Sequence, residues 1–161
     1  MKKTRIPEWK DVEGSKRISQ QTMLKSITSL TQALVELITN VDDAYERLNS
    51  PNKKYRGNCA VFYDRGGETR PTTIKVSDRA AGMDSEKLYS VLKKHGDKVK
   101  SEGASRGFFA RGLLDTSSIA DVFIQTVKNK KITTAQIKHQ TMQYKIIDKD
   151  VALNQVNKTL A

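Results

Sequence analysis

The sequence has little cysteine, few aromatic residues and no long apolar run, and these shortages exclude several classes of protein. Its one cysteine, Cys59, cannot form an intramolecular disulfide, so we expect a reducing, cytoplasmic setting. No apolar run approaches the roughly 20 residues that a transmembrane helix needs, so no membrane partner is expected. The sequence also contains no internal repeat and no low-complexity segment. These exclusions leave an ordinary globular protein as the expected class.

Length and composition predict a single domain. The 161 residues allow one domain with a hydrophobic core, and 37% apolar with 29% charged residues is typical of a globular chain. Residues 1–18 show no clear periodicity and are predicted to form an N-terminal arm, with Trp9 as an anchor. Residues 19–161 are predicted to form the domain.

Acidic residues are in deficit, and the deficit is uneven along the chain. The net charge is +11; residues 1–50 contain 8 basic and 7 acidic residues, whereas the remainder contains 21 and 11. A basic balance favours partners that carry phosphate groups, which include both nucleotides and nucleic acids. The charge alone does not choose between these two.

Apolar periodicity predicts the positions of the helices and strands. Apolar residues recur at steps of four and three from Met23 to Leu48, which predicts an amphipathic helix that ends before Pro51. Further helices are expected to begin at Asp84 and at Gly112. The expected strands are 58–64, 72–77, 122–127, 132–137 and 144–147, with a turn at 129–130. Helices segregated from antiparallel hairpins are typical of an α+β two-layer sandwich.

Three polar residues of the first predicted helix share one face. Glu36, Asn40 and Asp43 are spaced by four and three, so they fall within roughly 60° of one another beside the apolar stripe. A carboxylate or carboxamide at the edge of a core is costly to desolvate unless something uses it. The alternative interpretation is an acidic helix flank in contact with solvent.

Two further segments have the composition of ligand-binding turns. A predicted strand ends at Asp78, and a turn of small residues then leads to Gly82 and Met83; the alternative role of such an aspartate is a turn residue or helix cap. Glycines and arginines alternate in residues 103–112, ahead of the last predicted helix. Glycine lets backbone amides approach an anion closely, although such loops are often simple connections.

Together these segments resemble the GHKL superfamily of ATP-binding domains, which includes topoisomerase ATPase subunits, heat-shock chaperones, histidine kinases and mismatch-repair clamps. Its E-x-x-x-N-x-x-D-A helix matches residues 36–44. Its D-x-G-x-G turn matches Asp78 and Gly82, but Ala80 stands where the first glycine is expected. An alanine fits there if its backbone has a negative φ. Its glycine-rich lid matches residues 103–112 loosely.

The resemblance implies a role for each matching residue. Asn40 would coordinate Mg²⁺, Asp78 would accept a hydrogen bond from the adenine amino group, and Glu36 would be the general base that activates water. The lid would cradle the phosphates, with charge from Lys98, Lys100, Arg106 or Arg111. The residues implied to bind nucleotide are Asn40, Asp78, Gly82, Met83, Lys98, Lys100, Gly103, Arg106, Gly107 and Gly112.

The resemblance also implies an α+β Bergerat-type fold, with helices on one face of a mixed, mostly antiparallel sheet. It implies Mg²⁺-dependent ATP binding and slow hydrolysis, coupled to lid closure or to homodimerisation. Such domains usually continue into a strand that supplies a threonine, so the chain is expected to be incomplete at its C-terminal end and to belong to a longer protein.

Two alternative functions stay open. One is a nucleotide sensor that does not hydrolyse ATP. The other is a basic nucleic-acid-binding module, because seven of the nine charged residues from Lys87 to Arg111 are basic. Few aromatic residues lie among them, so base stacking in that segment is poorly supported.

Overall fold

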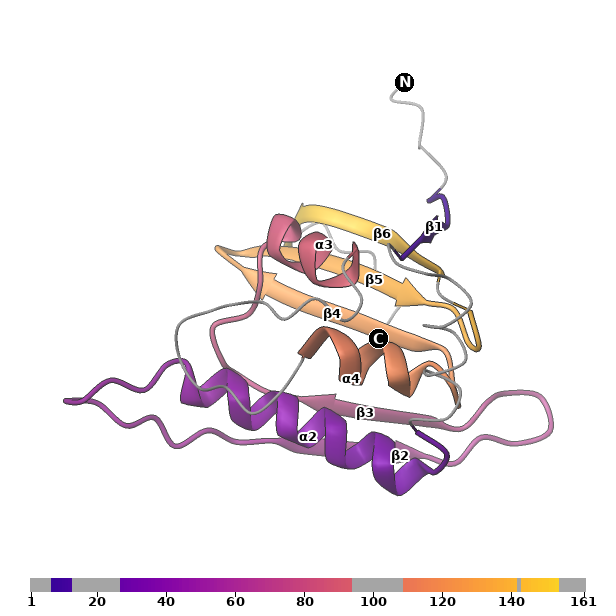
Figure 1. Cartoon of the computed structure of the whole chain (residues 1–161), viewed down its shortest axis with the longest axis horizontal. Coiled ribbons are helices and arrows are strands. Elements are labelled where there is room, and N and C mark those ends of the chain that lie inside the picture. Colours follow the sequence, from indigo (N-terminus) through magenta and orange to yellow (C-terminus); the bar gives the residue numbers. More distant parts are fainter. Residues whose placement is uncertain (1–6, 13–26, 94–108, 142, 154–161) are drawn as a thin grey trace.

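The computed structural model describes residues 7–12, 27–93, 109–141 and 143–153 (Figure 1). Within these ranges the protein is α+β, and every strand pair is antiparallel. The elements are β1 (Lys10–Asp11), α2 (Leu30–Glu46), β2 (Ala60–Asp64), β3 (Thr73–Ser77), α3 (Ser85–Lys93), α4 (Phe109–Thr116), β4 (Val122–Lys128), β5 (Lys131–Ile137) and β6 (Gln143–Ala152).

The strands form two separate sheets, whereas the resemblance predicted one mixed sheet. A four-stranded sheet has the order β1-β6-β5-β4, and β2 and β3 form a hairpin of their own. β2 and β3, β4 and β5, and β5 and β6 pair as neighbours in sequence, whereas β1 pairs with the distant β6; no strand pairing in the described ranges joins β3 to β4. The hairpin is closed near its turn by two hydrogen bonds from the Arg70 guanidinium to the Asp64 carboxylate, at 2.6 and 3.0 Å.

The β4–β5 hairpin confirms its prediction from sequence. Asn129 and Lys130 connect the two strands, and both have positive φ, at 50° and 59°. Positive φ at both central positions is the geometry of a type I′ turn, whose twist matches that of the flanking strands. This turn fixes the register of β4 against β5.

The first helix begins later than the apolar periodicity predicted. Ile27 and Thr28 are not helical, and Ser29 is the N-cap, with an extended backbone and a side chain that accepts the Gln32 N–H. Serine in this role satisfies one of the free amides of the first turn. Ile27 is nevertheless 4% exposed, so its apolar character reflects burial outside the helix.

The other two helices of the described ranges, α3 and α4, begin close to their predicted positions. Asp84 caps α3, because its carboxylate accepts the Lys87 N–H at 2.8 Å. α4 begins at Phe109, before the predicted Gly112. Nothing in the preceding residues opposes helix formation, since phenylalanine, alanine and arginine are all tolerated in a helix.

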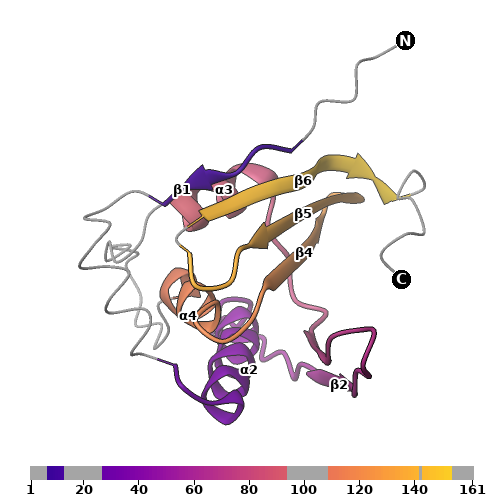
Figure 2. The same ribbon diagram turned by 90° about the vertical axis from the view of Figure 1, so that its right-hand side faces the viewer.

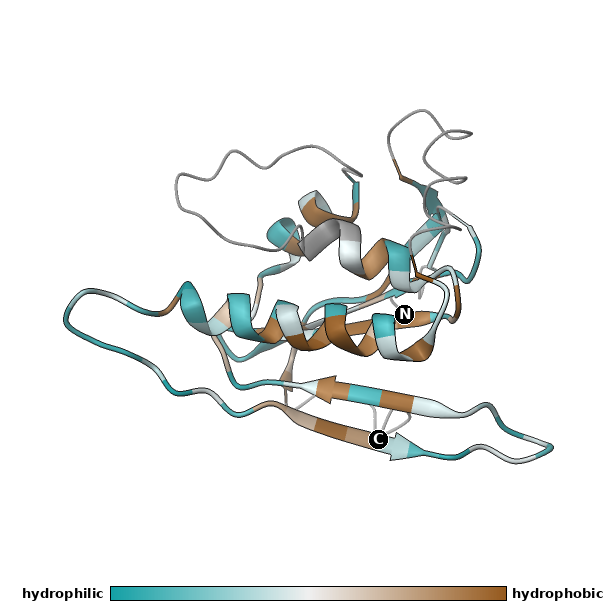
Figure 3. Ribbon diagram, turned by 60° about the horizontal axis from the view of Figure 1, so that its bottom comes forward, coloured by the Kyte–Doolittle hydropathy of each residue, from teal (hydrophilic) through white to brown (hydrophobic). Residues whose placement is uncertain are grey.

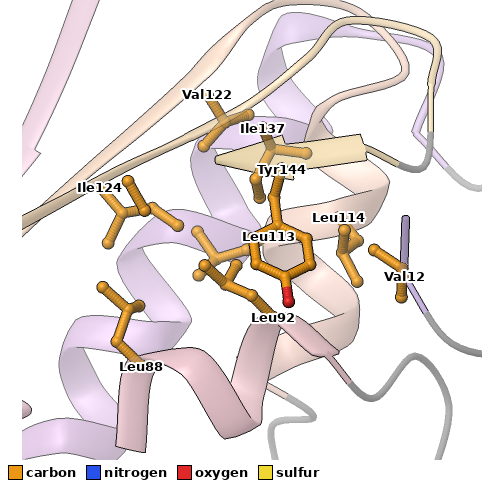
Figure 4. Packing of buried hydrophobic residues seen from close by; sticks show 10 residues of the cluster. Val12, Leu88, Leu92, Leu113, Leu114, Val122, Ile124, Ile137 and Tyr144 are labelled. Atoms are coloured by element: carbon orange, nitrogen blue, oxygen red, sulfur yellow. The ribbon is translucent and has the colours of Figure 1, made fainter. Parts of the chain in front are cut away.

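The core lies between one face of the four-stranded sheet and the helices α3 and α4 (Figure 2). In β4, buried and exposed residues alternate, so every second side chain points into the core. Tyr144 of β6 is 1% exposed and lies near the centre, beside Leu92 and Leu113 (Figure 4). The buried members are Val12, Leu88, Leu92, Leu113, Leu114, Val122, Ile124, Ala135, Ile137 and Tyr144.

Part of the predicted arm belongs to the folded domain. β1 pairs with β6, and Val12 is 3% exposed in the core. The predicted anchor, Trp9, lies under two ammonium groups, with Lys145 Nζ 4.4 Å and Lys138 Nζ 5.8 Å from its ring centroid. β6 extends beyond the predicted 144–147, and β1 pairs with its first two residues, Gln143 and Tyr144.

Helix α2 and the β2–β3 hairpin lie side by side (Figure 3), and they carry most of the large apolar side chains that are exposed in the described ranges. Val35, Phe62 and Tyr63 are 57%, 58% and 63% exposed. Cys59 is a free, exposed thiol at the entry to β2. No helix in the described ranges is both long enough and apolar enough to cross a membrane.

Candidate functional site

Helix α2 buries two of its three predicted site residues. Asn40 is 7% exposed and Asp43 is 2% exposed, whereas Glu36 is exposed. Asn40 Nδ2 and Asp43 Oδ2 have no hydrogen-bond partner in the described part of the chain. A buried polar atom without a partner costs about 1–3 kcal/mol, and such atoms commonly mark the place of a water, an ion or a ligand. The acidic-flank interpretation therefore fails for Asn40 and Asp43, because neither contacts solvent freely.

Glu36 lies against Gly112 where α2 crosses α4. A Cβ placed on Gly112 would be 2.5 Å from Glu36 Oε2 and 3.5 Å from its Cδ. Gly112 is buried and is the fourth residue of α4. The absence of a side chain at Gly112 thus leaves room for the Glu36 carboxylate, a contact that the spacing in the sequence did not predict.

The turn after β3 has the geometry of a local aspartate turn. Asp78 Oδ1 accepts the Ala80 N–H at 2.8 Å, which is the structural role weighed as the alternative for this residue. Asp78 is exposed, and its Oδ2 atom has no partner within the described ranges, so one oxygen is left for a ligand. Ala80 is not among the described residues with positive φ, so alanine fits there without strain.

Gly82 closes the turn in a conformation that only glycine adopts freely. Its φ is 62°, and a Cβ at this position would collide with the carbonyl oxygen of Val127 in β4. The next residue, Met83, is partly buried against the core. Gly82 thus allows a close approach of the turn to the β4 backbone; its predicted approach to the adenine base stays a prediction.

Two side chains missed by the sequence reasoning hold this turn. Thr126 Oγ1 accepts the Met83 N–H at 2.7 Å and donates to the Met83 carbonyl at 3.2 Å. Tyr45 Oη accepts the Arg79 N–H at 2.9 Å. Thr126 was detectable in principle, since it is the one polar residue at the inward positions of β4, after Val122 and Ile124.

These elements converge at one side of the molecule. The carboxyl ends of β3 and β4 and the amino end of α4 lie at the same side, next to the C-terminal half of α2 (Figure 1). Asn40, Glu36 and the turn at 78–83 are therefore brought to one region by elements that are far apart in sequence.

Most of the predicted lid lies outside the described residues: this applies to Lys98, Lys100, Gly103, Arg106 and Gly107. The described ranges contain no group of three or more histidine, cysteine, aspartate or glutamate side chains suited to hold a metal ion. A Mg²⁺ ion bound with nucleotide needs fewer protein ligands, because phosphates and waters complete its shell. The buried Asn40 carboxamide could supply its oxygen as one ligand, and its unpaired nitrogen could donate a hydrogen bond to a phosphate oxygen.

Comparisons with protein-family models, with curated proteins and with solved structures found no match. The site must therefore be interpreted from its own residues.

Proposed function

We propose that this protein binds ATP with Mg²⁺ at the region bounded by α2, α4 and the turn at 78–83, and that it hydrolyses the γ-phosphate slowly. The observation that carries the proposal is the pair of buried, unpaired polar atoms on Asn40 and Asp43. A hydrated metal–phosphate group offers both the acceptors and the donors that these two atoms lack.

Each residue is assigned one role. Asn40 would provide an oxygen ligand to Mg²⁺, and the Asp78 oxygen that is not bound to Ala80 would accept the adenine amino hydrogen. Glu36 would orient and activate the attacking water, because it is an exposed carboxylate with no competing partner in the described part of the chain. The bound metal would neutralise charge on the phosphates.

The proposal includes the finer fold assignment, a Bergerat-type two-layer sandwich. Its support is the order of the elements: a helix carrying Glu36 and Asn40, a hairpin ending in Asp78, and an antiparallel sheet covered by α3 and α4. Lid closure and dimerisation remain predictions from the resemblance.

Thermal stability tests nucleotide binding directly. A ligand that binds only the native state raises its stability by about 2.7 kcal/mol at 100 times its Kd. For a domain of this size we expect a rise of roughly 5–10 °C in Tm with Mg²⁺ and a non-hydrolysable ATP analogue. An unchanged Tm at saturating analogue would refute the proposal.

Two substitutions separate binding from chemistry. Asp78→Asn should abolish ATP binding, since a carboxamide can present its nitrogen to the adenine amino group. Glu36→Ala should bind the analogue like the parent but release no phosphate. If Glu36→Ala hydrolyses ATP at the parent rate, the general-base assignment is wrong. If the parent binds ATP and releases no phosphate, the protein is a nucleotide sensor.

A nucleic-acid partner is the second candidate function, favoured by the charge around the β2–β3 hairpin. The exposed basic residues there are Lys53, Lys54, Arg56, Arg65, Lys75 and Arg79. Exposed phenylalanine and tyrosine side chains in β2 supply stacking surfaces close to these basic residues. Binding to an oligonucleotide should weaken steeply with salt. It should also weaken in a Lys53→Glu, Arg56→Glu variant and be unaffected by Asp78→Asn.

A further inference from the structure

The turn between Asp78 and Met83 is attached to the rest of the protein near both of its ends. At one end the Arg79 N–H donates to Tyr45 Oη, and this hydroxyl donates in turn to the Asn58 carbonyl at 3.3 Å. At the other end the Thr126 hydroxyl binds both the N–H and the carbonyl of Met83. The turn is therefore tied to α2 on one side and to β4 on the other.

The β4 attachment is the more demanding of the two. Thr126 is 7% exposed, so water molecules cannot readily replace the hydrogen-bond partners of its hydroxyl. A single hydroxyl that both accepts and donates fixes the direction of the bound peptide as well as its distance. The adjacent Gly82 approaches the Val127 carbonyl so closely that no side chain fits between them. The turn and β4 thus meet backbone to backbone.

From this geometry we infer that Thr126 is a positioning residue that sets the base selectivity of the nucleotide site by fixing the turn that carries Asp78. The inference rests on the proposed function. Thr126 does not touch the base; it holds Met83, and Met83 ends the turn whose other end presents the Asp78 carboxylate. A selective hydrogen bond to the adenine amino group requires a carboxylate held in advance at the correct place.

The test compares the intact chain with Thr126→Val, which removes the hydroxyl and keeps a branched side chain. Loss of this anchor should raise the Kd for an ATP analogue about tenfold, the effect of losing one or two hydrogen bonds. It should also narrow the ratio of GTP-analogue to ATP-analogue Kd values. Inorganic tripolyphosphate, which has no base, should bind with its parent affinity. Thr126→Ser should restore both the ATP affinity and the selectivity.

A matched control lies directly across the sheet. Thr133 of β5 pairs with Thr126 in register, is 2% exposed, and accepts the Asp150 N–H at 3.2 Å. Thr133→Val removes a similarly buried hydroxyl whose hydrogen bond in the described ranges is to Asp150 and not to the turn. It should leave the ATP Kd and the selectivity ratio unchanged.

Amide hydrogen exchange examines the attachment without any nucleotide. In Thr126→Val the Met83 amide should exchange about tenfold faster than in the parent, while the Leu88 amide inside α3 should be unaffected. Parent-like exchange at Met83, or a parent-like ATP Kd in Thr126→Val, would overturn the inference. An equal loss of tripolyphosphate and ATP affinity would overturn it too, because a general loss of folding would then explain both. If the parent protein binds no nucleotide, the proposed function is wrong. If Met83 exchanges at the parent rate in Thr126→Val, Thr126 does not hold the turn, whatever the result with nucleotide.

Discussion

Replacing Gly112 with alanine should separate the stability of the protein from its proposed chemistry. Inside a helix, alanine is about 1 kcal/mol more favourable than glycine. At Gly112 the added Cβ would stand 2.5 Å from Glu36 Oε2, so the carboxylate must retreat by about 1 Å to reach an ordinary contact. Its new rotamer costs of order 0.5–1.5 kcal/mol. The two contributions nearly cancel, and we expect a free energy of unfolding within about 0.5 kcal/mol of the parent.

The effect on hydrolysis should be much larger. A misplacement of about 1 Å in a catalytic group can lower the rate by a factor of about 10², so phosphate release at saturating ATP should fall by roughly one to two orders of magnitude. Urea unfolding and a steady-state phosphate assay measure the two effects on the same sample. Gly67→Ala is the control, because a Cβ at that position meets nothing within 4 Å.

A double-mutant cycle determines whether Gly112 acts through Glu36. In a Glu36→Ala background the obstructing carboxylate is gone, so Gly112→Ala should stabilise the protein by about 1 kcal/mol and cause no further loss of rate. Parent-like hydrolysis by Gly112→Ala would refute the reasoning. The reasoning would also be refuted if Gly112→Ala changed the unfolding free energy equally with and without the Glu36 side chain, because residues 36 and 112 would then not be coupled.

Three further predictions concern single residues. Ser29→Ala should lower the free energy of unfolding by about 1 kcal/mol in urea, because the Gln32 amide loses its cap, whereas Ser29→Gly should cost only a few tenths. Lys130→Gly should raise the Tm by about 1–3 °C in calorimetry, since glycine adopts positive φ without strain; Lys131→Gly, one residue into β5, should lower it. Asn40→Ala should remove the Mg²⁺ dependence of nucleotide affinity in calorimetric titrations, and an unchanged dependence would remove Asn40 from the metal site.

Local patterns were sufficient to predict most of the elements. The β4–β5 hairpin followed from alternation and from its turn, and the α3 start followed from Asp84. The predicted start of α2 was wrong because the apolar periodicity was extended through Ile27. That residue is buried by contacts distant in sequence, including the Ser118 hydroxyl that donates to its carbonyl at 2.5 Å.

Site residues could be predicted to lie together only where a single helix or turn contained all of them. Helix geometry placed Asn40 and Asp43 beside the apolar stripe but left their burial open, and Glu36 on the same face is exposed. The contact of Glu36 with Gly112, and that of Thr126 with Met83, join residues 76 and 43 positions apart. No local period encodes such contacts, because they depend on how α2, α4 and β4 pack together. The pairing of β1 with β6 was missed for the same reason.

The unpaired edge of β4 has a consequence for how this protein behaves at high concentration. Among the described strands β4 pairs only with β5, and its solvent face exposes Phe123 and Val127 at 58% and 43%. The turn at 78–83 covers this edge at the Val127 carbonyl, so the part left as a template for pairing with another chain is 122–125, which contains no charged residue. The net charge of +11 keeps copies apart at low ionic strength, but at 1 M salt the screening length falls to about 3 Å. Colloidal stability therefore depends on long-range repulsion between molecules, and concentrated solutions should be prepared in dilute buffer.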